Sequence, residues 1–178
     1  MAHNAEAVAS YNFSPKDKLL LDTNIWLLVY GPQKPVDSRV KIYSQALSKI
    51  LAAKSRIYID VVIVSEFINA YARQKWKLVA PRIKKFKAFR ESAGFKSVAQ
   101  NIAADVQCVL KYCTLIERGF KSLEIDTLID EYALGHSDFN DQILAILCKK
   151  EGLKLLTDDS DFKRQDVTLI TANKELLT

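Results

Sequence analysis

Residues 141–162 read DQILAILCKKEGLKLLTDDSDF, and this stretch decides the class of fold. Its apolar residues first recur at helical spacing and then run together, so it predicts a helix over Asp138–Lys150 and a buried strand over Leu153–Thr157. Gly152 stands between the two elements, where glycine commonly ends a helix. A helix that leads directly into an apolar strand is typical of βαβ units, so the stretch predicts a parallel sheet.

The same alternation of strands and helices extends outward from residues 141–162. Further strands are predicted at Lys18–Leu21, Arg56–Asp60, Ser122–Ile125 and Val167–Ile170. Amphipathic helices are predicted at Ser38–Ala53 and Val62–Trp76, with a pair of helices within Lys77–Gly119. We therefore expect an α/β fold built on a parallel sheet of about five strands.

The composition fits a single globular domain that spans residues 1–178. Of these 178 residues 49% are hydrophobic and 26% charged, and 5 Gly and 4 Pro are too few for a flexible linker. Three cysteines without a CxxC pair and two histidines argue against a disulfide framework and a structural zinc site. The sequence shows no signal peptide and no apolar run long enough for a membrane span, so we expect a cytoplasmic protein without a membrane partner.

Carboxylates stand at the ends or starts of several predicted elements. Asp22 comes directly after the first apolar strand, and Asp159 follows the strand that ends at Thr157. Asp141 lies in the first turn of the helix that enters this last strand, and Glu66 lies in the first turns of another helix. Because working groups in parallel sheets gather beyond the carboxyl ends of the strands, we expect these four acids to meet.

Four carboxylates in one place require positive charge. Without a cation they would repel one another, and some would be forced to stay protonated. Their hard oxygen atoms suit Mg²⁺ or Mn²⁺, while the lack of a His/Cys cluster argues against Zn²⁺. The net charge of +5 and the isoelectric point of about 9.0 are consistent with a polyanionic partner. The residues therefore indicate metal-assisted chemistry on a phosphate.

The segments LDTNI at 21–25, VSE at 64–66 and residues 141–162 resemble the PIN-domain family, which includes VapC-like ribonuclease toxins and RNA-processing endonucleases. The last segment is the most specific, because its run of Asp, helix, Gly, strand and Thr-x-Asp-x-Asp-Phe matches the family in spacing and residue type. The resemblance implies a three-layer α/β/α fold with parallel strands in the order 3-2-1-4-5 and a variable helical region at about 75–120. It also implies Mg²⁺- or Mn²⁺-dependent cleavage of RNA, a homodimer and, in the toxin families, a small antitoxin.

The resemblance also assigns site residues. The family's acidic site is matched by Asp22, Glu66, Asp141 and Asp159. Its accompanying polar positions are matched by Thr23, Asn24 and Thr157. We expect Asp22 and Asp141 to be primary metal ligands, with Asp159 and Glu66 binding directly or through water. Glu66 is also a candidate for orienting the attacking water.

Each acid has a structural explanation when it is taken alone. Asp22 could cap the helix that follows it, and Glu66 could be a solvated helix residue. Asp138 is better explained as the N-cap of its helix. Asp60 also ends a strand, but no catalytic role is assigned to it. The acids favour catalysis only jointly, since four independent coincidences at the family's spacing are much less common than one site.

Residues 73–96 form a strongly basic segment with interleaved aromatic residues. Its candidate contacts to RNA phosphates are Arg82, Lys84, Lys85 and Lys87. The aromatic residues are Trp76, Phe86, Phe89 and Phe95. They could stack on bases, or they could face the core of an amphipathic helix whose lysines are only solvated.

Two other functions are open at this point. A catalytically silent RNA- or protein-binding module could retain the PIN fold, although such a protein usually loses one of the four acids. A phosphatase of the haloacid dehalogenase type also has an acid after its first strand, but its second Asp is replaced here by Asn24. The sequence leaves undecided the choice between RNA and DNA, between toxin and RNA-processing enzyme, and between one metal ion and two.

Overall fold

The computed structural model describes residues 4–32, 37–116, 123–135 and 138–178. Within these ranges the chain forms a sheet of six parallel strands, in the order β1-β6-β5-β2-β3-β4. The strands are β1 (Asn4–Ala7), β2 (Lys18–Leu21), β3 (Arg56–Ile59), β4 (Cys113–Leu115), β5 (Lys154–Leu156) and β6 (Thr168–Thr171). The central strands β2 and β5 are largely buried and apolar, as expected of strands covered on both faces.

The predicted strand order is confirmed, with two differences in the strands themselves. Taken in chain order, β2 to β6 lie in the arrangement 3-2-1-4-5, and β1 adds a sixth strand beside β6. The third strand is Cys113–Leu115, so the prediction of a strand at Ser122–Ile125 is wrong. Residues 123 and 124 belong to no strand, residue 125 begins a helix, and residue 122 lies outside the described ranges. A three-residue edge strand has little signal of its own, because it is defined by its pairing with β3.

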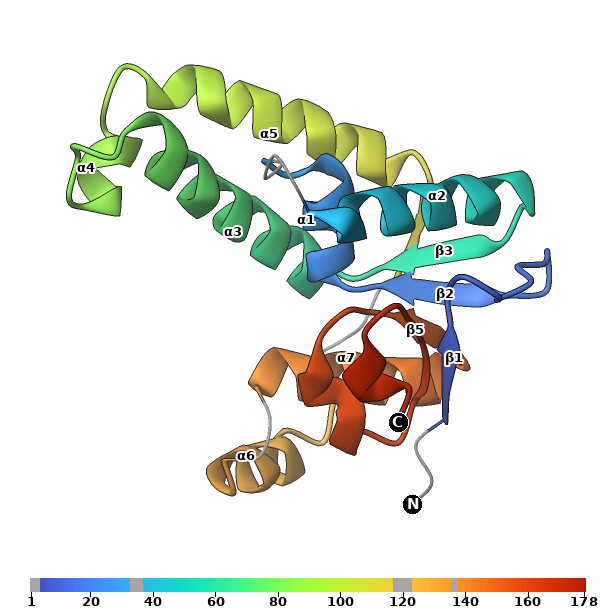
Figure 1. The fold of residues 1–178 in the computed structure, drawn as a ribbon. Coiled ribbons are helices and arrows are strands. Elements are labelled where there is room, and N and C mark those ends of the chain that lie inside the picture. The colour runs from blue at the N-terminus through green and yellow to red at the C-terminus, as the bar shows by residue number, and fades with distance from the viewer. Residues whose placement is uncertain (1–3, 33–36, 117–122, 136–137) are drawn as a thin grey trace.

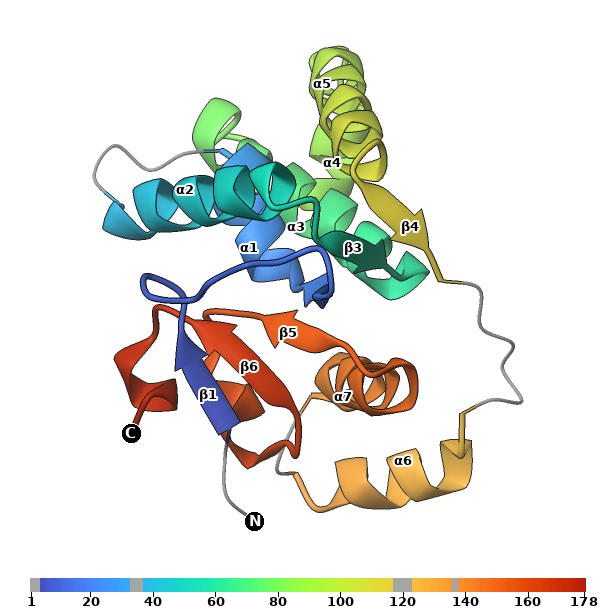
Figure 2. The same ribbon diagram turned by 90° about the vertical axis from the view of Figure 1, so that its right-hand side faces the viewer.

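Helices lie on both faces of the sheet (Figure 1, Figure 2). One face carries α1 (Thr23–Tyr30), α2 (Ser38–Ala52), α3 (Val61–Val79) and α5 (Phe95–Leu110), with the short α4 (Phe86–Arg90) between α3 and α5. The other face carries α6 (Ile125–Ala133) and α7 (Phe139–Glu151). Right-handed crossovers explain this division, because the chain moves outward from β2 to β4 and then returns to β5 and β6. The predicted three-layer α/β/α fold is confirmed.

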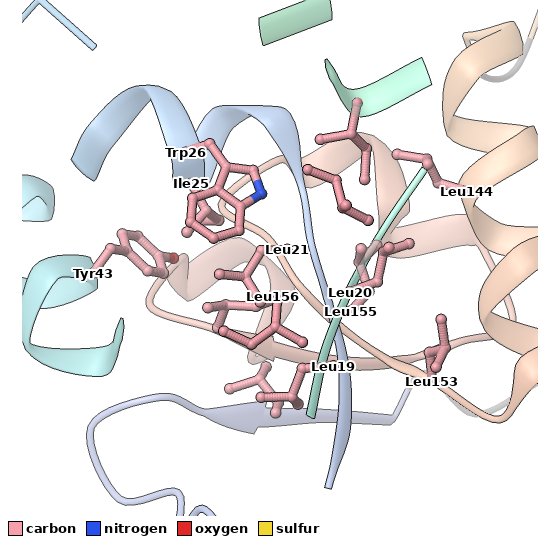
Figure 3. Packing of buried hydrophobic residues seen from close by; sticks show 14 of the residues in the cluster. Leu19, Leu20, Leu21, Ile25, Trp26, Tyr43, Leu144, Leu153, Leu155 and Leu156 are labelled. Atoms are coloured by element: carbon pink, nitrogen blue, oxygen red, sulfur yellow. The ribbon is translucent and has the colours of Figure 1, made fainter. Parts of the chain in front are cut away.

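The core lies between the central strands and the helices of both faces. Leu19–Leu21 in β2 and Leu155–Leu156 in β5 are fully buried. Figure 3 shows these side chains between Ile25 and Trp26 of α1 and Leu144 of α7. Burial of one such side chain contributes about 1.5–3 kcal/mol, so β2 and β5 are firmly held where the candidate acids leave the sheet.

The predicted helical region at about 75–120 contains more than a pair of helices. It comprises the end of α3, then α4, α5 and β4, while residues 117–122 lie outside the described ranges. The aromatic residues pack on one another, with ring centroids 5.6 Å apart for Trp76–Phe86, 6.3 Å for Phe86–Phe89 and 5.4 Å for Phe89–Phe95. This packing favours a small apolar core over a base-stacking surface. None of the helices in the described ranges is both long and apolar enough to cross a membrane.

Candidate metal centre

The four candidate acids project from elements around the carboxyl ends of β2 and β5. Asp22 follows β2 and begins α1, while Asp159 leads into the short 3-10 helix η2 (Ser160–Arg164) after β5. Glu66 lies in the second turn of α3, and Asp141 lies in the first turn of α7. The strands β2 and β5 are neighbours in the sheet. The charges of Asp22, Asp159 and Glu66 all act on Asp141, so the fold brings the four carboxylates into one electrostatic neighbourhood.

The carboxylate of Asp22 is held by side chains and by the backbone of Thr23, and it makes no capping hydrogen bond to the helix it begins. Asp22 occupies the N-cap position of α1, but its side chain accepts no capping hydrogen bond. Thr157 Oγ1 donates to Asp22 Oδ2 over 2.7 Å, and Asn24 Nδ2 donates to the same oxygen over 2.5 Å. By contrast, Asp60 and Asp138 each accept a hydrogen bond from a backbone N–H at the start of α3 and α7. The capping explanation therefore fits Asp60 and Asp138, and also Asp159 at the start of η2, but not Asp22.

Two hydroxyl groups hold the acids in place. The hydroxyl of Thr157, which is completely buried, accepts from the backbone N–H of Asp159 over 3.0 Å and donates to Asp22. Thr23 Oγ1 donates to Glu66 Oε2 over 3.0 Å and so ties α1 to α3. The polar residues selected from the sequence therefore contact the acids selected with them.

Burial and mutual repulsion make two of the acids retain protons. Asp22 is only 5% exposed, and burial together with the charges of Glu66 and Asp159 raises its pKa to about 7. The hydrogen bond from Thr157 lowers this pKa but does not cancel the effect of burial. Burial, and then the surrounding carboxylates, with Asp22 first, raise the pKa of Asp141 to about 8. Full ionisation of the cluster near neutral pH therefore requires positive charge beside it.

The chemistry of the donors fits a hard divalent cation. Carboxylates and hydroxyls supply only oxygen atoms, which Mg²⁺ and Mn²⁺ prefer. A cation here would also relieve the desolvation and repulsion that keep Asp22 and Asp141 protonated. In the part of the chain that the structure describes, no three Asp, Glu, His or Cys side chains stand close enough together to form a ready-made metal-binding group.

A second network, which sequence analysis missed, secures the turn after β5. Asp158 Oδ1 accepts from the Tyr43 hydroxyl over 2.7 Å, and Oδ2 accepts from Arg39 Nη1 over 3.0 Å. The backbone N–H of Asp158 donates to Asn24 Oδ1, and its carbonyl accepts from Asn173 Nδ2. These contacts fix the direction in which the next residue leaves the strand. One sequence signal was available, because a cation in the first turn of a helix, as in α2, is disfavoured by the dipole unless a carboxylate partners it.

The cations predicted to contact RNA lie away from the acids. Arg82, Lys84, Lys85 and Lys87 are exposed and lie before or within α4. Figure 1 shows α4 at the outer end of α3 and α5, away from the sheet. From Glu66 to Val79, α3 alone spans about 20 Å at 1.5 Å per residue. These cations are therefore candidates for binding a substrate and not for the chemical step.

Comparison with known protein families gives a match over most of the chain. A family model of the PIN domain matches residues 19–167. The chain belongs to the PIN-domain family. PIN domains are generally nucleases that use divalent metal ions, which agrees with the acidic cluster. A search of curated proteins gives no significant match.

Among solved structures, this PIN domain is similar to a chain in the crystal structure of VapBC2 from Rickettsia felis bound to a DNA fragment from their promoter. The two chains are 20% identical with a TM-score of 0.53, and the match covers 88% of this chain and 98% of that chain. At this identity the similarity concerns the fold alone, and it agrees with the α/β/α layers described above.

Proposed function

We propose that this PIN domain is a Mg²⁺- or Mn²⁺-dependent endoribonuclease that hydrolyses RNA phosphodiester bonds at Asp22, Glu66, Asp141 and Asp159. The observation that carries the proposal is the environment of Asp22. Its carboxylate is buried at the end of β2, caps no helix, and has a pKa raised to about 7 by burial and by neighbouring acids. Such a carboxylate is stabilised in its ionised form by a bound cation.

The acids and their neighbours have separate tasks in this proposal. Asp22 and Asp141 bind the ion directly, and Asp159 binds it directly or through water. Glu66, oriented by the Thr23 hydroxyl, positions the water whose oxygen bonds to phosphorus as the bond to the leaving oxygen breaks. The attacking water releases one proton to solvent, and the leaving oxygen takes one proton from solvent. When bound, the ion supplies Lewis acidity at the phosphate and a lower pKa for its bound water.

Binding and partners are the next part of the proposal. The exposed cations Arg82, Lys84, Lys85 and Lys87 bind backbone phosphates of RNA outside the active site. The narrower role that we propose is that of the toxin in a toxin–antitoxin pair, since a chain of the VapBC2 complex has the same fold. In that role the protein is a cytoplasmic homodimer that a small antitoxin inhibits, and residues 1–178 act as one nuclease domain.

Cleavage of end-labelled single-stranded RNA tests the chemistry, with the DNA of the same sequence beside it. Each substrate is incubated with Mg²⁺, Mn²⁺ or EDTA and with wild type, Asp141→Asn or Asp126→Asn. Asp126 is an exposed acid of α6 and serves as the matched control. We expect metal-dependent cutting of RNA by wild type and Asp126→Asn, and none by Asp141→Asn.

Other outcomes would point to other functions. Neither cutting nor metal binding by calorimetry would favour the catalytically silent binding module. Equal cutting of DNA would show that the 2′-hydroxyl is not required and would overturn the assignment to RNA. For the toxin role, we expect growth arrest on expression of wild type but not of Asp22→Asn.

A further inference from the structure

A cavity of about 670 Å³ opens beside the candidate metal centre. Asn24 and Asp159 belong both to that centre and to the wall of the cavity. Arg39 of α2 and Lys77 of α3 line other parts of the wall. The volume lies in the range of roughly 300–1,000 Å³ that holds small organic ligands in proteins.

The wall of the cavity combines apolar side chains with two cations and three carboxylates, of which Asp37 and Asp158 are paired with Arg39. The apolar part consists of Leu27, Leu28, Val40 and Leu78. The cationic part consists of Arg39 and Lys77. A nucleotide has the same division, since a flat base with two apolar faces is joined to a charged phosphate. A purely apolar ligand would make no use of Lys77 or of the exposed Arg39 side chain, and a free anion would leave the apolar wall uncovered.

Arg39 is held in place before a ligand arrives. Its Nε and Nη2 atoms donate to Asp37 over 2.9 Å and 2.7 Å, and Nη1 donates to Asp158 over 3.0 Å. The Arg39 side chain is nevertheless 51% exposed, whereas those of Asp37 and Asp158 are 15% and 10% exposed. The guanidinium, and not the two carboxylates, is therefore the group that faces solvent. A side chain fixed in this way loses little conformational entropy on binding.

We infer that this cavity binds the nucleotide next to the scissile bond, with its base against the apolar wall and its phosphate at Arg39 and Lys77. The inference rests on the proposed function, because a cation held at Asp22 and Asp159 would bind the scissile phosphate there. The neighbouring nucleotide would then lie beside Asp159 and Asn24, where the cavity begins. The base that fits the cavity then sets a preference at one position of the cleavage site.

Binding of mononucleotides tests the cavity without any cleavage, since they contain no phosphodiester linkage to cut. The four nucleoside 5′-monophosphates are titrated separately into methyl-labelled protein in Mg²⁺, with ribose 5-phosphate as the probe that lacks a base. We expect at least one nucleotide to shift the methyl signals of Leu27, Leu28 and Val40, and ribose 5-phosphate to leave them unchanged. Lys77→Gln should weaken this binding several-fold without disturbing the Arg39–Asp158 pair.

Cleavage of substrates with single abasic sites tests the same cavity during the reaction. Wild type should lose about tenfold in rate when the one base that enters the cavity is removed. Leu78 lines the cavity and is 62% exposed, so the larger side chain of Leu78→Trp should fill the cavity. This variant should cut the intact substrate and the abasic substrate at the same reduced rate. Val79→Trp is the matched control, because Val79 is the next residue, is 57% exposed and does not line this cavity.

The possible outcomes distinguish failure of the proposed nucleotide binding from failure of the proposed nuclease activity. Methyl shifts without RNA cutting would support the cavity and refute the proposed cleavage. RNA could also be cut without methyl shifts, and with equal effects of every abasic site in wild type and Leu78→Trp. This result would refute nucleotide binding in the cavity and would leave the proposed nuclease activity supported. Equal effects of Leu78→Trp and Val79→Trp would also refute nucleotide binding in the cavity.

Discussion

Replacing Asp141 by asparagine should stabilise the metal-free protein at alkaline pH, although it removes a proposed ligand. Burial, and then the charges of nearby acids, with Asp22 first, raise the pKa of Asp141 from 3.8 to about 8. As the pH rises, the unfolded chain releases this proton first and the folded protein releases it last. The unfolded state is therefore increasingly favoured over this interval. Asparagine does not ionise, so the variant does not suffer this loss.

The size of the effect follows from the two pKa values. The stability that protonated Asp141 contributes is fully present below pH 3.8 and is lost as the pH rises through about 8. Between about pH 5 and pH 8 the loss corresponds to about 4 kcal/mol, at 1.36 kcal/mol per pKa unit. Because Asp141 is partly exposed, solvent screening reduces this to about 1–2 kcal/mol. That is a measurable part of a total stability of roughly 5–15 kcal/mol.

Urea unfolding in EDTA at about pH 5 and pH 8 measures this difference. The free energy of unfolding of Asp141→Asn relative to wild type should be higher at pH 8 than at pH 5 by about 1–2 kcal/mol. Asp126→Asn, at an exposed position of α6, should show the same difference from wild type at both pH values. An Asp141→Asn difference that does not change with pH would refute the argument that burial and repulsion keep the proton on this acid.

Three further predictions concern the site and its surroundings. Thr157→Val removes the buried hydroxyl that donates to Asp22, so the free energy of unfolding should fall by about 1–3 kcal/mol and cleavage should be lost. Thr168→Val on β6 is the control. Mn²⁺ at about 100 times its Kd should raise the unfolding free energy of wild type by about 2.7 kcal/mol but not that of Asp22→Asn, and an equal gain in both would remove Asp22 from the site. Glutamate at positions 84, 85 and 87 should reduce the salt slope of RNA binding by about 2, at about 0.7 per lost phosphate contact, and an unchanged slope would exclude these lysines.

Local sequence signals were sufficient for the elements that position the acids. β2 and β5 are apolar runs, and Gly152 ends α7 with a φ of +63°, the conformation that glycine adopts most easily. Asp138 caps α7, as its place before the helix predicted. Asp22 and Asp159 could be selected because parallel strands end at a common edge, and both residues follow such strands.

Contacts between distant segments decided the rest. β4 exists because it pairs with β3, and β1 because it pairs with β6. Arg39 and Asp158 are 119 residues apart, so no local pattern could join them. The raised pKa values of Asp22 and Asp141 likewise depend on burial and on carboxylates from other elements. The sequence specifies the functional groups of a residue, but tertiary packing determines its partners and its exposure to water. The same kind of side chain is therefore a helix cap at Asp60 and a candidate metal ligand at Asp22.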